Sequence, residues 1–168
     1  MKQIDIQKLT ETYDARLLGE EDADDILRIM HGNPIFYEYT TAKAERDAII
    51  EDMKALPPGK MAADKYYFGF FDHDQLIAVM DLINGYPDEE TAFIGFFMMA
   101  AEKQGRGAGS HLVQDVLKEL KRLGFAKARL CINKGNPQSS HFWYKNGFVP
   151  LKETARGIET VILAERKL

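Results

Sequence analysis

The chain has 168 residues, of which 45% are hydrophobic and 29% charged, with 22 Lys and Arg against 26 Asp and Glu and a formal net charge of −4 at pH 7. A chain of this length buries about two-thirds of the surface that its unfolded form exposes, and its one cysteine and four scattered histidines exclude an intramolecular disulfide and offer no zinc-ligand spacing. No apolar run approaches the roughly 18 residues of a membrane-spanning helix, so we predict a cytoplasmic protein with no metal, no membrane span and no signal peptide.

The first third of the chain predicts one strand and two helices. Residues 12–18 form a strand pattern, and residues 20–30 predict a helix whose acidic first turn suits the positive end of the helix dipole. Gly32-Asn33-Pro34 ends that helix. A second helix is predicted over about residues 41–56, where Pro57-Pro58-Gly59 stops it.

The pattern then changes from helical spacing to runs of aromatic and branched residues. Residues 66–71 and 76–83 predict a hairpin around Asp72-His73-Asp74-Gln75. Residues 91–99 are apolar almost throughout, as expected of a strand buried on both faces.

The last third adds an amphipathic helix over residues 110–123, a second short helix and three more strands. The strands are predicted at residues 126–132, 148–151 and 158–164, and the short helix at residues 139–146. The element order βααβββαβαββ predicts an α/β (α+β) fold in which helices pack on a mixed sheet. Nothing marks a domain boundary, so we expect one domain, residues 1–168, with about residues 1–11 as a short N-terminal extension.

A glycine-rich turn, residues 104–110 (Gln-Gly-Arg-Gly-Ala-Gly-Ser), lies between the buried strand and the amphipathic helix. Glycines let a backbone approach a ligand closely, and the first turn of a helix presents unpaired N–H groups and partial positive charge. The turn therefore predicts a pyrophosphate site, to which Arg106 adds a cation, although glycine can also serve packing alone. A nucleotide-triphosphate loop is excluded because no Lys follows Gly109, and a dinucleotide fingerprint fails because its third glycine falls at Ser110 or Leu112.

Two motifs in this region resemble those of the GNAT N-acetyltransferase superfamily. Gln104, Gly107 and Gly109 match the family's Gln/Arg-x-x-Gly-x-Gly/Ala signature for the acetyl-CoA pyrophosphate. Residues 136–148 (Asn-Pro-Gln-Ser-Ser-His-Phe-Trp-Tyr-Lys-Asn-Gly-Phe) are similar to its Asn-x-x-Ala-x-x-Phe-Tyr-x-Lys-x-Gly-Phe element. The resemblance extends over about residues 12–168, and it implies a GNAT-like mixed, mostly antiparallel sheet of about seven strands flanked by about four helices.

The resemblance also implies cofactor-binding residues. The backbone of the strand near its end would pair with the pantetheine arm, the amides of the glycine-rich turn would hold the pyrophosphate, and Asn136 would bond the pantetheine arm, although a helix N-cap role suits Asn136 equally well. The implied set is Phe97, Met98, Met99, Gln104, Gly105, Arg106, Gly107, Ala108, Gly109, Ser110, Asn136 and Trp143.

The catalytic groups are less well defined, because Trp143 stands where many family members carry a tyrosine that protonates the CoA sulfur. An indole cannot deliver a proton as a phenol can, so we interpret Trp143 as packing over the thioester end of the cofactor. Tyr144 is the candidate acid, although adjacent helical residues point about 100° apart. Cys131 is interpreted as a core residue. The candidate bases are Asp81, Glu89 and Glu90, each of which has the alternative of a solvated loop residue.

We therefore expect an acetyl-CoA-dependent N-acetyltransferase of EC 2.3.1 type in which a neutral amine attacks the thioester directly in a ternary complex, with no metal. The alternative is a non-enzymatic acyl-CoA-binding or sensor protein of the same fold. The expected partner is a small-molecule or peptide amine, with neither nucleic acid nor membrane, and a homodimer stays open. Phe36, Tyr37 and Tyr39 either line an acceptor pocket or belong to the core.

The net charge is divided unevenly along the chain. Residues 1–90 hold 9 Lys and Arg against 20 Asp and Glu, and residues 91–168 hold 13 against 6, so that the two parts carry −11 and +7. The positive part contains every implied cofactor residue, and CoA is a polyanion; the negative part contains the expected acceptor wall. We expect a cationic acceptor on this ground, with a mixture of solvated helix faces as the alternative.

Overall fold

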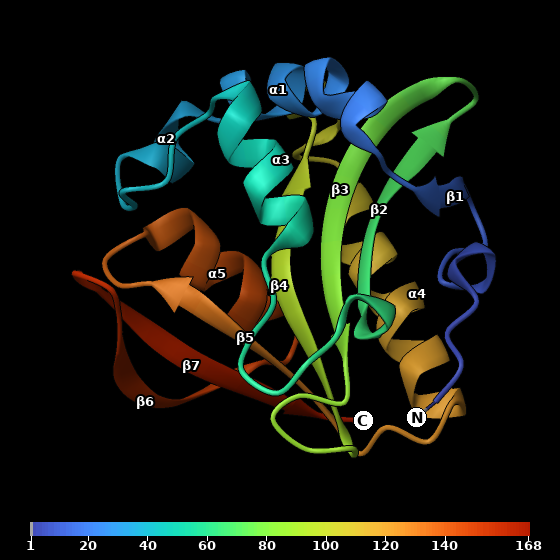
Figure 1. The fold of residues 1–168 in the computed structure, drawn as a ribbon, viewed down its shortest axis with the longest axis vertical. Helices are drawn as coiled ribbons and strands as arrows, with labels where there is room; N and C mark the ends of the chain where they lie inside the picture. Colours follow the sequence, from blue (N-terminus) through green and yellow to red (C-terminus); the bar gives the residue numbers. More distant parts are fainter. Residues whose placement is uncertain (1) are drawn as a thin grey trace.

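The computed structural model describes residues 2–168, and within them seven strands form one mixed sheet in the order β1-β2-β3-β4-β5-β7-β6 (Figure 1). All neighbouring strands are antiparallel except β4 and β5, which are parallel. The strands are β1 (Asp14–Leu17), β2 (Lys65–Asp72), β3 (Gln75–Asn84), β4 (Thr91–Met99), β5 (Lys127–Asn133), β6 (Val149–Arg156) and β7 (Glu159–Lys167).

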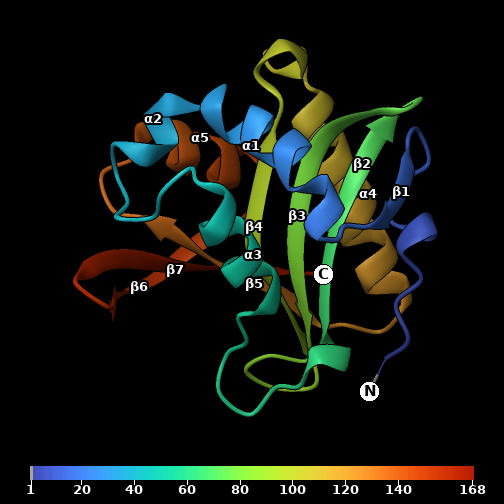
Figure 2. The ribbon, with the colours of Figure 1, turned by 45° about the horizontal axis from the view of Figure 1, so that its top comes forward.

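Helices cover both faces of this sheet. Figures 1 and 2 show α1 and α3 on one face and α4 on the opposite face. The helices are α1 (Ala23–His31), α2 (Pro34–Tyr37), α3 (Arg46–Lys54), α4 (Ala108–Arg122) and α5 (Pro137–Lys145). The sequence-based prediction of the fold class, a mixed and mostly antiparallel sheet of about seven strands with helices against it, is confirmed.

Two apolar clusters hold the layers together, because successive residues of a strand point to opposite faces of the sheet. Burial of each large apolar side chain stabilises the fold by roughly 1.5–3 kcal/mol. The α4-side core includes Phe68, Phe70, Met80, Leu82, Leu112, Val116 and Leu120. The α1-side core includes Ile26, Ile29, Ile49, Tyr67, Val79 and Met98.

Strand β4 has the predicted bounds but a different environment. Its register with β3 shifts, since Asp81 pairs with Phe96 whereas Leu82 pairs with Ile94, and this leaves Gly95 as the extra residue of a β-bulge. Its pairing with β5 ends at Ile94 and Leu130, and the two strands diverge beyond that point (Figure 2). The prediction of burial on both faces is therefore wrong for the middle of the strand, where Gly95 is exposed.

The second predicted helix, the loop before it and the closing hairpin differ from the predictions. The second predicted helix is shorter, Arg46–Lys54, and the preceding loop contains the unpredicted short helix α2, which begins at Pro34 because proline suits a first helical position. The closing hairpin is longer than predicted. Its turn contains Gly157, with φ of 60°, and Ile158, which is 92% exposed although its apolar character suggested a strand.

The N-terminal segment packs against the sheet. Ile4 and Leu9 are buried in the α4-side core, on either side of a 3₁₀ turn at Ile6–Lys8. None of the helices in the described residues is long and apolar enough to cross a membrane.

Candidate functional site

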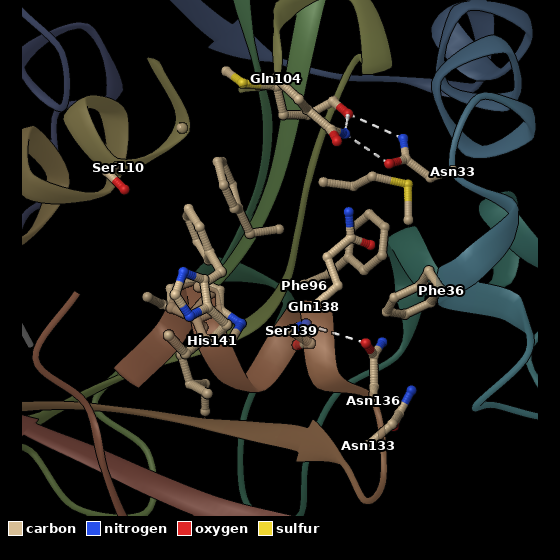
Figure 3. Close-up of a pocket in the computed structure, with 18 of the residues that line it drawn as sticks. Asn33, Phe36, Phe96, Gln104, Ser110, Asn133, Asn136, Gln138, Ser139 and His141 are labelled. Carbon is tan, nitrogen blue, oxygen red and sulfur yellow. Dashed lines mark hydrogen bonds between the residues drawn. The ribbon is translucent and has the colours of Figure 1, made fainter. Parts of the chain in front are cut away.

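A cavity of about 400 Å³ opens where β4 and β5 diverge (Figure 3), a volume typical of small-molecule sites. It is lined by β4, the glycine-rich turn, β5 and α5, with Asn33 and Phe36 from the segment after α1 and Arg156 from β6. Among the residues predicted to bind a cofactor, those on the cavity wall are Phe97, Met98, Met99, Gln104, Gly105, Gly107, Gly109, Ser110, Asn136 and Trp143. Arg106 and Ala108 belong to the same turn but are not on the wall.

The end of β4 presents to this cavity an edge that no neighbouring strand pairs. The amide of Ala100 donates to the carbonyl of Ile77 on β3 at 2.7 Å, so the Met99 carbonyl, on the other side of that peptide, faces away from β3. Alternate residues of a strand direct their backbone groups to the same side, which places the N–H and C=O groups of Phe97 on the open side as well. An extended ligand can pair with such an edge as an added strand does.

The glycine-rich turn presents further amides. Gly105 and Gly107 both have φ of +80°, which strongly favours glycine, and a Cβ at either position would meet nothing within 4 Å. The first hydrogen bond of α4 runs from the His111 amide to the Gly107 carbonyl at 3.0 Å. The amides of residues 108–110 therefore precede the bonded part of a 15-residue helix, where a phosphate is favoured.

The Gln104 side chain is bound within the protein. Its Nε2 donates to Oδ1 of Asn33 at 2.7 Å and to the Met99 carbonyl at 2.8 Å (Figure 3). Asn33 in turn donates to the same carbonyl at 3.0 Å and to Ile29 at 2.9 Å. Gln104 thus joins the glycine-rich turn to the segment between α1 and α2.

Asn136 caps the N-terminus of α5. This is one of the two roles that the sequence allowed for it, the other being ligand binding. Its Oδ1 accepts from the Ser139 amide at 3.1 Å (Figure 3). Among the described residues its Nδ2 has no hydrogen-bond partner within the protein, so the cap leaves a donor for a ligand.

Trp143 and Tyr144 point in different directions, as their adjacency on a helix predicts. Trp143 is 7% exposed and packs in the α4-side core, with ring centroids 4.9 Å from Phe142 and 5.3 Å from Phe148. Tyr144 is 38% exposed and is not on the cavity wall. The candidate acid therefore has no place in the cavity.

Cys131 lies on the cavity wall, where the sequence suggested a core position. Burial raises the pKa of its thiol, so the reactive thiolate is suppressed at neutral pH. The three candidate bases lie in different parts of the structure. Glu89 and Glu90 are exposed in the loop before β4, whereas Asp81 lies within β3 rather than at a strand end.

The far end of the cavity is formed by segments that sequence reasoning did not bring together. Phe36 packs edge-on against Phe96, with centroids 5.9 Å apart (Figure 3), and both Phe36 and its neighbour Tyr37 pack against the α1-side core. Arg156 donates to Oδ1 of Asn133 at 2.6 Å, and both residues line the cavity. Arg156 was missed because it lies beyond the predicted end of its strand, in a segment without a clear strand pattern.

The predicted acidic acceptor wall is not found at the cavity surface. The first 90 residues contribute only Asn33 and Phe36 to the lining, and the Lys and Arg side chains on it are Lys145 and Arg156. In the part of the chain that the structure describes, no group of His, Cys, Asp and Glu is placed to hold a metal ion.

Comparison with known proteins identifies a family. The model of the acetyltransferase (GNAT) family matches residues 28–148. A search of the curated proteins finds no match.

Many solved structures share the fold. An acetyltransferase from Thermus thermophilus is similar with a TM-score of 0.74 and 21% identity, over 94% of this chain and 98% of its own. The PaiA N-acetyltransferase of Thermoplasma acidophilum, solved in complex with coenzyme A, has a TM-score of 0.67 and 17% identity over 94% and 100%. Ribosomal-protein-S5-alanine acetyltransferase from Vibrio fischeri has a TM-score of 0.64 and 18% identity, over 94% of each chain. At these identities the likeness concerns the fold alone.

Proposed function

The chain belongs to the acetyltransferase (GNAT) family, and from this premise we propose that it transfers the acetyl group of acetyl-CoA to a primary amine by direct attack in a ternary complex. The observation that carries the proposal is the meeting of two unpaired backbone surfaces at one cavity. These are the open edge of β4 and the amides at the start of α4.

The residues present fit acetyl-CoA. The amides of residues 105–110 would hold its pyrophosphate. The backbone of Phe97, the amide of Met99 and Nδ2 of Asn136 would hold the pantetheine arm, because the Met99 carbonyl already accepts from Gln104 and Asn33. When bound, acetyl-CoA supplies an acetyl group activated as a thioester. The β4 amides facing the cavity would donate to the oxygen on which negative charge develops during attack, which is commonly the largest contribution to such catalysis.

Direct attack is favoured over a covalent acyl-enzyme. The thiol on the wall, Cys131, is kept protonated by its raised pKa. Among the described residues, no basic group accepts a hydrogen bond from it. Holding the amine beside the thioester then supplies much of the rate enhancement through proximity.

The acceptor is proposed to be a cationic small-molecule or peptide amine. The negative charge that would attract it lies behind the cavity lining, in Asp81 and Asp52, rather than on the wall. A cytoplasmic location belongs to the same proposal, as does the absence of a metal requirement.

Gly107→Glu tests the cofactor site, with Gly59→Glu as its matched control. Both glycines have φ of +80° and nothing within 4 Å of an added Cβ, so the backbone strain is alike, but only Gly107 borders the cavity. We expect calorimetry to show acetyl-CoA affinity falling at least about tenfold in Gly107→Glu, since a carboxylate at the cavity would repel the pyrophosphate, and staying unchanged in Gly59→Glu. Equal affinities in the two variants would contradict the site.

Turnover tests the reaction itself. Release of CoA from acetyl-CoA is measured with polyamines, aminoglycosides, amino acids and peptide N-termini. Acetylation of an amine supports the transferase, whereas tight binding of acetyl-CoA without turnover on any amine supports the acyl-CoA sensor. A preference for neutral or acidic acceptors would contradict the proposed cationic acceptor.

A further inference from the structure

The carboxylate of Asp81 lies where a side chain at the cavity-lining residue Gly95 would be. Its Oδ2 lies 2.6 Å from the position that a Cβ at Gly95 would take. Gly95 is the extra residue of the β4 bulge, it lies directly after the last residue of β4 that pairs with β5, and it lines the cavity. A carboxylate from β3 therefore reaches the point where the cavity begins, because position 95 has no side chain.

The hydrogen bonding of this carboxylate is incomplete. Its Oδ2 accepts from Nζ of Lys65 at 2.8 Å, in a pair whose side chains are 15% and 6% exposed respectively. Its Oδ1 is buried and has no hydrogen-bond partner among the described residues. Buried acceptors without a partner are rare because they lose their hydration without compensation.

The charged groups around Asp81 are a second carboxylate and two cations. The charge of Asp52, on α3, raises the pKa of Asp81 and that of Lys65 lowers it, while Arg156, on the cavity lining, acts on Asp52 through its charge. The phenols facing them are Tyr67 and Tyr37, and burial raises the pKa of both, which keeps them neutral. Lys65 is therefore the cation that acts directly on Asp81.

We propose that Asp81 is the residue that receives the proton of the acceptor's ammonium group at the β4 bulge. This inference rests on the proposed function and assigns the general base of that reaction. The recognised chemistry is a primary ammonium, which would approach Oδ2, the oxygen of Asp81 that lies nearest the Cβ position of Gly95.

The step balances without a further reactant. The ammonium gives one proton to the Asp81 carboxylate and becomes a neutral amine. The amine nitrogen uses its freed lone pair to form the bond to the acetyl carbonyl carbon, and the C–S bond breaks with its electron pair on sulfur. The nitrogen loses its second proton to the sulfur, and Asp81 returns the first to solvent.

The surroundings tune Asp81 for this role. Burial raises the pKa of its carboxyl group, the Lys65 ammonium lowers it, and the charge of Asp52 raises it again, with a net upward direction. A base whose pKa is closer to the working pH takes protons from an ammonium more readily than an exposed carboxylate does.

Asp81→Asn is the first test, because the amide keeps the shape and removes the base. We expect kcat/KM for the acceptor to fall about 10²–10⁴-fold at pH 7. The loss should shrink as pH rises toward about 10, where the amine deprotonates by itself, and the Kd of acetyl-CoA should stay within twofold. A variant whose pH profile is parallel to that of the wild type overturns the assignment, whatever its absolute rate.

Lys65→Met is the second test, since it retains the base and removes its cationic partner. The acid limb of the kcat/KM profile should move to a pH about 1 to 3 higher, because an opposite charge lowers a neighbouring pKa by that much. An unmoved limb overturns the proposal. Glu90→Gln, at an exposed carboxylate, is the control and should match the wild type.

Gly95→Ala covers the case in which Asp81→Asn fails to fold. It adds a methyl group where Oδ2 lies and alters no titratable group, and we expect at least a tenfold loss in kcat/KM with acetyl-CoA binding retained. Wild-type activity in Gly95→Ala would overturn the role of Asp81 and leave the proposed function intact. If the wild-type protein itself acetylates no amine, the proposed function is overturned as well.

Discussion

The side-chain amide of Gln104 donates a 2.7 Å hydrogen bond to Oδ1 of Asn33. Both amides also donate to the carbonyl of Met99, at 2.8 and 3.0 Å. One small network therefore holds together the glycine-rich turn, the end of β4 and the segment that leads into α2. Because that segment continues to Phe36 on the cavity wall, the network fixes the glycine-rich turn and the Phe36 side of the cavity relative to each other.

The two ends of this hydrogen bond should be energetically coupled. Asn33→Ala and Gln104→Ala each remove the shared bond together with bonds of their own, so the double variant should be more stable than the sum of the two losses predicts. We expect a coupling of about 0.5–1.5 kcal/mol, the net value of one hydrogen bond, measured by urea unfolding of the wild type and the three variants. Losses that add within about 0.3 kcal/mol would show that the residues act independently.

The strands and the glycine-rich turn were predictable because their signals are local. The run from Thr91 to Met99 is apolar almost throughout, and glycines at 105, 107 and 109 stand directly before an amphipathic helix. The β4 bulge was not predictable. It depends on how β3 and β4 pair across the sheet, and a change of register leaves no local pattern in either strand.

The same limit applies to the chemistry of the site. The sequence indicates Asp81 only as one of three acids near strand ends, since nothing local shows that its carboxylate reaches Gly95. It indicates Asn33 only as part of a helix stop, and the bond from Gln104 to Asn33 joins residues that are 71 positions apart. Contacts between distant segments are set by packing, which composition and periodicity do not encode.

Trp143→Ala should be strongly destabilising, and Tyr144→Ala provides the matched control one residue away. Trp143 is buried among Phe97, Phe142 and Phe148, so its truncation leaves a cavity and should lower the free energy of unfolding by about 3–5 kcal/mol. The partly exposed Tyr144 should lose less than about 1 kcal/mol. Similar losses in urea unfolding would contradict the division of this helix into a core face and a surface face.

Tyr144→Phe should leave the chemical step largely intact. The variant removes only the hydroxyl group of a side chain that is not on the cavity wall, so we expect kcat to change less than about tenfold, below the 10²–10⁴-fold that acid catalysis typically contributes. The measurement is steady-state kinetics with saturating acetyl-CoA. A thousandfold fall would mean that the phenol acts as the acid and enters the cavity during turnover.

Glu159→Gln should destabilise the protein in a pH-dependent way. Burial opposes the charge of Glu159, but hydrogen bonds from the Thr41 amide and from the side chains of Thr40 and Arg156 outweigh it and lower its pKa to about 2 from the usual 4.5. These bonds tie the loop after α2 to the β6–β7 hairpin, next to Arg156 on the cavity wall.

The sign of the effect follows from that lowered pKa. The folded state holds the proton of Glu159 less tightly than the unfolded state, so the stabilisation is complete above about pH 4.5 and is lost as pH falls toward 2. We expect Glu159→Gln to reduce the free energy of unfolding by about 1.5–3 kcal/mol at pH 7, and the difference from the wild type to shrink at pH 3. Glu153→Gln is the control, since this exposed glutamate of the same hairpin pairs only with Lys134 and should cost less than about 1 kcal/mol. A penalty for Glu159→Gln that is equal at pH 7 and pH 3 would show that the carboxylate charge does not hold the loop to the hairpin.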